Sequence, residues 1–103
     1  MDYKIEWTKP ALDDLESIAE HVSRDSPVYT SIVVEKIIEI VDQIRDLPLL
    51  GRVVPEVNNE NLRERFVFSY RLIYLLEEST IKIIAIIHGK RLIDSFQDRW
   101  PQN

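Results

Sequence analysis

The segment at residues 66–91, which begins FVFSYRLIY and ends IIHGKR, constrains the fold more than any other part of this chain. Two runs rich in Ile, Leu, Val and aromatic residues flank a polar stretch at residues 77–80. This pattern predicts an antiparallel hairpin whose strands are buried on both faces. A two-residue or a four-residue loop pairs Leu76 with Ile81, whereas a loop of odd length would shift the register by one residue.

That register assigns the side chains of the hairpin to two faces of a sheet. One face is wholly apolar and consists of Tyr70, Leu72, Tyr74, Leu76, Ile81, Ile83, Ala85 and Ile87. The other face consists of Ser69, Arg71, Ile73, Leu75, Lys82, Ile84, Ile86 and His88. We therefore expect Arg71 to lie diagonally next to His88, in the middle of an otherwise apolar surface.

The first half of the chain has the spacing of helices. Residues 3–7 alternate between apolar and polar and predict a short strand. Thr8 is placed to cap a first helix, whose acidic residues we expect to face solvent. Ser26 and Pro27 start a second helix, which Pro48 ends. Two helices with so short a connection form an antiparallel pair, and the apolar sheet face can cover their apolar stripes.

The rest of the chain completes an α+β domain. Residues 49–61 form a long irregular segment, of a kind that is often functional. The spacing of Leu92, Ile93, Phe96 and Trp100 predicts a short C-terminal helix over the second sheet face. We expect a single domain over residues 1–103, with a helical hairpin packed on one face of a small antiparallel sheet.

Composition excludes several classes of protein. The chain has 103 residues, a net charge of −5 and no cysteine, so neither a disulfide framework nor a Cys-ligated zinc site can form. It begins without a secretory signal and has no apolar run of membrane-spanning length, so we expect a cytoplasmic protein without a membrane partner. His21 and His88 lack carboxylates at ligand spacing, so we expect no metal and no other cofactor.

Arg71 is the residue whose chemistry most needs an explanation. A guanidinium buried among apolar neighbours is costly unless it is paired. One interpretation is a structural arginine paired with Glu56 or a terminal carboxylate. The other is an anion-binding arginine on the floor of a concave face. The second is favoured because further basic residues would line the same phosphate-binding patch, namely Arg63, Arg65, His88, Lys90 and Arg91.

Five motifs follow one another in a characteristic order. They are W-x3-A-x-x-D-L at residues 7–15, LPLLGR at 47–52, VPE at 54–56, YRLIY at 70–74 and IIHGKR at 86–91. Together they resemble the RelE/ParE toxins of bacterial toxin–antitoxin modules over nearly the whole chain. The resemblance implies a toxin that arrests growth and that binds a cognate antitoxin encoded beside its gene.

The resemblance implies one of two mechanisms. RelE-like members cut mRNA on the ribosome without a metal, and ParE-like members share the fold but inhibit DNA gyrase. We expect the ribosome-dependent mRNA endonuclease, with gyrase inhibition as the alternative and an inactive relative as a third possibility. One departure bears on this choice, since Phe96 and Gln97 stand where RelE-type enzymes carry a tyrosine. The acidic net charge also fits the ParE-like branch better.

The resemblance and the predicted faces together assign site residues. The nuclease interpretation implies Arg71 and Arg91 for the phosphate, Glu56 and His88 for proton transfer, and Arg63, Arg65 and Lys90 for the RNA backbone. The apolar second sheet face, guarded only by the terminal helix, is the expected antitoxin-binding surface. Its residues are Val67, Ile73, Leu75, Ile84 and Ile86.

Overall fold

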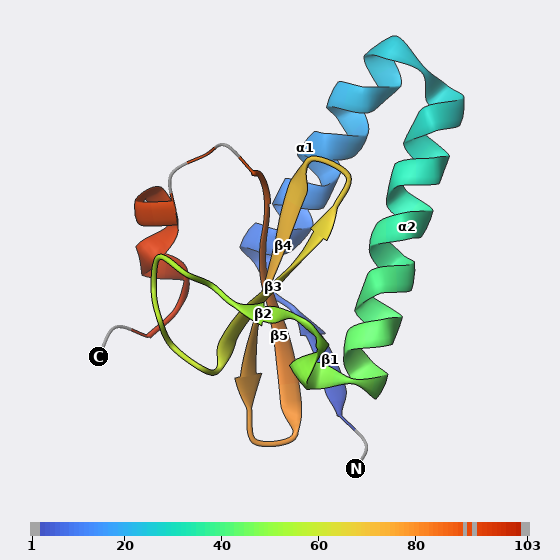
Figure 1. Ribbon diagram of the computed structural model, residues 1–103. Helices are drawn as coiled ribbons and strands as arrows, with labels where there is room; N and C mark the ends of the chain where they lie inside the picture. The colour runs from blue at the N-terminus through green and yellow to red at the C-terminus, as the bar shows by residue number, and fades with distance from the viewer. Residues whose placement is uncertain (1–2, 90, 92, 102–103) are drawn as a thin grey trace.

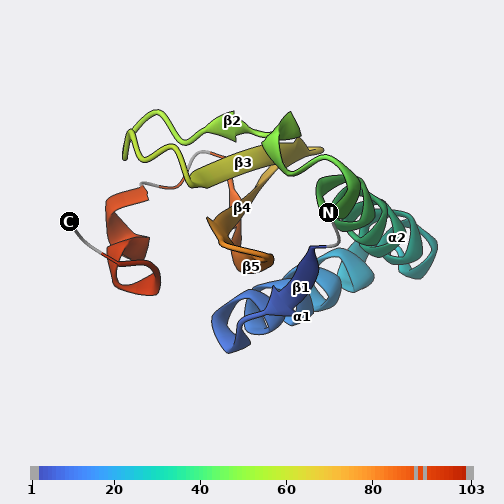
Figure 2. The same cartoon turned by 90° about the horizontal axis from the view of Figure 1, so that it is seen from below.

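A computed structural model describes residues 3–89, 91 and 93–101 of the chain. Over these residues a five-stranded sheet carries two long helices on one face and a 3-10 helix on the other (Figures 1 and 2). The strands are β1 (Lys4–Trp7), β2 (Arg52–Val53), β3 (Leu62–Val67), β4 (Tyr70–Glu77) and β5 (Thr80–His88). The helices are α1 (Lys9–Asp25), α2 (Pro27–Asp46) and the 3-10 helices η1 (Pro48–Leu50) and η2 (Ile93–Arg99). The α+β class is confirmed.

Both long helices begin at the predicted caps. The Thr8 hydroxyl accepts a hydrogen bond from the Ala11 N–H at 3.3 Å, and the Ser26 hydroxyl accepts one from the Tyr29 N–H at 3.2 Å. The two helices form a hairpin whose apolar stripes pack on the sheet (Figure 2). Its buried residues are Ala11, Ile18, Val22, Val33, Ile37, Ile40, Val41 and Ile44. No helix within the described part of the chain is long and apolar enough to span a bilayer.

The sheet is mixed because its N-terminal strand runs parallel to the last one. The strand order is β1-β5-β4-β3-β2, and Ile5 of β1 lies opposite Ile81 of β5. The other strand pairs are antiparallel, as expected. The alternation at residues 3–7 predicts a strand, but it carries no information about that strand's partner or direction. Residues 80–83 of β5 have a strand on each side, and the whole strand has a core on each face, which explains its apolar sequence.

The β4–β5 hairpin keeps the predicted register only near its turn. Leu76 pairs with Ile81 and Tyr74 with Ile83, as the turn length requires. A β-bulge follows, in which Ile84 has no partner and the register shifts by one residue. A bulge depends on the surrounding packing, and the local apolar pattern of this strand gives no sign of it.

Beyond the bulge, the side chains of β5 exchange faces relative to those of β4. Ala85 and Ile87 pack on the side away from the long helices, and Ile86 packs against the helices. Arg71 lies opposite Ile87. His88 is the next residue along β5, so it points to the other face. The predicted neighbouring of Arg71 and His88 is therefore wrong.

The second sheet face is a closed core. Its buried residues are Val54, Leu62, Ile73, Leu75, Ile84, Ala85, Ile87, Ile93, Phe96 and Trp100. The last three come from η2 and the residue after it, which confirms the predicted C-terminal helix; Leu92 lies outside the described residues. Of the residues expected to bind the antitoxin, only Ile73, Leu75 and Ile84 belong to this face. Val67 and Ile86 pack with the long helices instead, because of the strand alternation and the bulge. All five residues are buried.

An ion pair between Asp14 and Arg99 takes the place of a strand along part of β5. Because β1 ends at Trp7, the rest of β5 lacks a neighbouring strand on that edge. The Ile86 N–H donates to Asp14 at 3.0 Å, and Arg99 donates to the Ile84 carbonyl at 3.2 Å. Arg99 and Asp14 are themselves 2.6 Å apart. Asp14 is thus a structural residue, and the expectation that it belongs to a solvated helix face is wrong.

Candidate functional site

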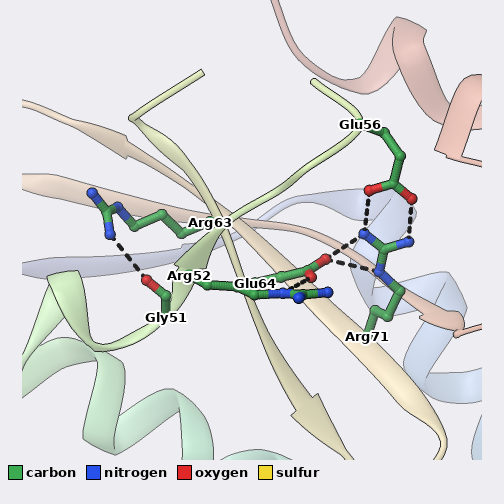
Figure 3. Close-up of polar contacts among 6 residues, drawn as sticks. All are labelled: Gly51, Arg52, Glu56, Arg63, Glu64 and Arg71. Carbon is green, nitrogen blue, oxygen red and sulfur yellow. Dashed lines mark hydrogen bonds and ion pairs between the residues drawn. The ribbon is translucent and has the colours of Figure 1, made fainter. Parts of the chain in front are cut away.

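Arg71 lies at the centre of a charge cluster made of Arg52, Glu56, Glu64 and Arg71 (Figure 3). The Arg71 side chain is 5% exposed and binds both oxygens of Glu56 at 2.8 Å. Its Nε also donates to Glu64 at 2.8 Å. Glu64 is 1% exposed and accepts a further hydrogen bond from Arg52 at 2.6 Å. Two arginines and two carboxylates satisfy one another on an otherwise apolar face. Arg71 is paired with Glu56, as the first of the two interpretations predicts.

The charge cluster fixes the protonation state of Glu56. Its hydrogen bonds with Arg71 lower the pKa of Glu56 from an ordinary 4.5 to about 2, although partial burial acts in the opposite direction. The same hydrogen bonds raise the pKa of Arg71 above its ordinary value. A general base works best when its pKa lies near the working pH. The geometry therefore gives Glu56 the properties of a counter-ion rather than those of a base.

We expect the Glu56–Arg71 pair to be visible in an acid titration. Because the pKa of Glu56 is depressed on folding, the pair stabilises the fold above about pH 4.5, and this contribution is lost as the pH falls toward 2. Carbon-detected NMR of the Glu56 carboxyl should give a midpoint near 2. In Glu56→Gln, unfolding should depend less on pH across that window. A midpoint near 4.5 would show that the pair does not form in solution.

Arg63 and Arg65 lie on the opposite side of β3 from the charge cluster. Arg63 donates to the carbonyls of Gly51 at 3.0 Å and Glu60 at 2.9 Å, and Figure 3 shows it pointing away from Arg71. Arg65 donates to Gln43 of α2 at 3.2 Å. Side chains alternate along a strand, so these two arginines cannot share a face with Glu64. The structure does not bring them together with Arg71.

His88 and Arg91 line a groove between α1 and the end of β5, with a volume of about 300 Å³. The groove is formed by Asp14, Ser17, Ile18, His21, Tyr70, Ile86, Ile87, His88 and Arg91. The Arg91 guanidinium lies 5.1 Å from the ring centroid of Phe96. The predicted nuclease residues thus divide among the charge cluster, the helix-facing side of β3 and this groove. Lys90 lies outside the described residues.

The sequence analysis missed Glu64, the most buried member of the charge cluster. Glu64 stands between Leu62 and Phe66 in strand alternation, on the side that faces the second core. It lies beside Arg71 because Phe66 pairs with Arg71 across the two strands. Glu64 occupies a position of the strand where the alternation places apolar residues, on the face that also carries a buried arginine. That position could have predicted an ion pair with Arg71.

The architecture defines a class of protein. Two helices on one face of a β1-β5-β4-β3-β2 sheet are the fold of the RelE/ParE-like toxins. One similar solved structure is a chain of the chromosomal ParDE toxin–antitoxin system from P. aeruginosa, with a TM-score of 0.71 and 21% sequence identity over 85% of this chain and 97% of that one. Another is a chain of the toxin–antitoxin complex RelBE2 from Mycobacterium tuberculosis, with a TM-score of 0.58 and 22% identity over 85% of this chain and 99% of that one.

The family follows from the sequence itself. A model of the ParE toxin of the type II toxin–antitoxin system parDE matches residues 5–93. The chain belongs to this family and is the toxin component of a type II toxin–antitoxin system. No curated protein sequence is similar enough to count as a match.

Proposed function

We propose that this toxin arrests growth by binding and inhibiting DNA gyrase, without cleaving RNA. The observation that supports this proposal most directly is the occupation of Arg71 by two carboxylates. Cleavage of a phosphodiester needs cations that can bind the crowded phosphate and groups that can move protons. Arg71 would have to leave Glu64, and a buried carboxylate that loses a partner costs several kcal/mol.

The second candidate is the ribosome-dependent mRNA endonuclease. One observation favours it, since His88 and Arg91 line the same groove. An imidazole and a guanidinium together can transfer a proton and stabilise a phosphate. This pair would have to act without Arg71, Arg63 and Arg65, which lie elsewhere, and Phe96 has no ionisable group to replace the missing tyrosine.

Two assays with the purified toxin separate the candidates. In a supercoiling assay, excess toxin should inhibit gyrase, and addition of the antitoxin should restore activity. In a cell-free translation reaction, the ends of a defined mRNA should be the same with and without toxin. RNA cuts that appear only during translation would overturn the proposal in favour of the endonuclease. Full gyrase activity with excess folded toxin would also overturn it.

A further inference from the structure

Four exposed apolar side chains lie on the β3–β4 turn and on the first turns of α2, and two of them, Tyr29 and Phe68, are in contact. We call Val28, Tyr29, Ile32 and Phe68 the apolar tip; their exposed fractions are 73%, 45%, 48% and 51%. The rings of Tyr29 and Phe68 are in contact, with centroids 6.1 Å apart. Ile32 lies one helical turn from both Val28 and Tyr29, so the three share one side of α2. Contiguous exposed apolar side chains of this kind mark binding surfaces.

The backbone of Phe68 shows that the turn itself does not favour a phenylalanine there. Phe68 and Ser69 connect β3 to β4, and Phe68 has a φ of 55°. Bulky residues are rare in this left-handed region, and two-residue hairpin turns prefer Asn or Gly. Since the residue is 51% exposed, burial does not fully compensate for the strain. Strain of this kind is typical of functional positions.

Tyr70 connects the groove to the apolar tip along the chain. Tyr70, two residues after Phe68, lines the groove and has its ring edge-on to His88 at 6.0 Å. Among the described residues that line the groove, the carboxylate Asp14 is paired with Arg99. The lining also holds the guanidinium of Arg91 and the imidazoles of His21 and His88. On a chain with a net charge of −5, this groove therefore suits an acidic ligand.

We propose that the apolar tip and the groove together form the surface that binds the antitoxin. The segment that docks here is amphipathic, with apolar side chains on the tip and carboxylates in the groove. The five residues predicted for this role are all buried, three in the second core and two against the long helices, whereas the apolar tip is accessible without any displacement. The proposal depends on the toxin having an antitoxin, and it does not depend on gyrase being the target.

The test compares two substitutions that relieve the same backbone strain. Phe68→Asn places a turn-forming residue at φ 55° and removes the ring from the tip. Glu78→Asn does the same at φ 50° in the β4–β5 turn, at the other end of β4. Both variants should melt at or above the wild-type temperature. Titration calorimetry with the antitoxin from the adjacent gene should give a Kd at least about tenfold weaker for Phe68→Asn, and an unchanged Kd for Glu78→Asn.

Three results would go against the proposal. Equal antitoxin affinity of Phe68→Asn and Glu78→Asn would overturn it. Ile32→Gln, on the exposed side of α2, should also weaken binding, and wild-type affinity there would exclude the tip as a whole. In cells, Phe68→Asn should arrest growth even when the antitoxin is co-expressed. If this variant lost toxicity but kept its antitoxin affinity, the surface would serve the toxin's target instead. If the toxin failed to inhibit gyrase, the proposed target would be wrong. The comparison of Kd values for the antitoxin would still test the binding surface.

Discussion

Replacing Arg71 with methionine should lower the free energy of unfolding by about 3–5 kcal/mol, the usual cost of removing one partner from a buried ion pair. Glu64 is 1% exposed and, among the described residues, would keep Arg52 as its ion-pair partner, whose side chain is 59% exposed. Glu56 could turn to solvent, since its side chain is already 41% exposed. Urea denaturation followed by circular dichroism measures the effect.

The matched control removes the stranded charge as well. Arg71→Met combined with Glu64→Leu should recover most of the lost stability, because an apolar pair suits the surrounding core. An Arg71→Met variant as stable as wild type would show that the charge cluster contributes nothing to the fold.

The double variant also tests the mechanism of toxicity. If the double variant is folded and still toxic, toxicity does not require Arg71 to bind a phosphate. If it is folded and harmless, the result favours the endonuclease, with Arg71 as its phosphate-binding residue.

Replacing Asp14 with alanine should cost about 2–3 kcal/mol, the value for a charge-assisted hydrogen bond plus an unsatisfied buried donor. The Ile86 N–H would lose its acceptor and Arg99 its counter-ion. Because Arg99 belongs to η2, hydrogen exchange should accelerate in residues 93–99 more than in β4. Asp13→Ala is the control, since that carboxylate is 60% exposed and its pair with Lys9 should contribute less than about 1 kcal/mol. Equal losses in the two variants would contradict the role assigned to Asp14.

Features that depend on neighbouring residues could be predicted from the sequence. The caps at Thr8 and Ser26, the register next to the β4–β5 turn and the C-terminal helix all depend on spacing within a few positions. The bulge at Ile84 and the parallel pairing of β1 could not, because tertiary packing selects both. The bulge then reversed the face predicted for every later residue of β5.

The candidate site was predicted less well for a related reason. Basic residues that are close in sequence or share a motif were expected to share a surface. Alternation along β3 sends Arg63 and Glu64 to opposite faces, and the bulge separates His88 from Arg71. The pairing of Arg71 with Glu56 was one of the two interpretations considered, and the cost of burying a guanidinium is sufficient reason for it.

The parallel pairing of the first and last strands also determines when this protein can fold. Thr8 bonds to Ile83, which is 75 residues away, and Asp14 bonds to Arg99, which is 85 residues away. Contacts between distant segments slow folding, and these two require nearly the whole chain. During synthesis, the N-terminal strand and first helix therefore cannot make these contacts until residues 83 and 99 have been added to the chain. Until then, the apolar surfaces that these contacts help to cover are open to a partner or to aggregation.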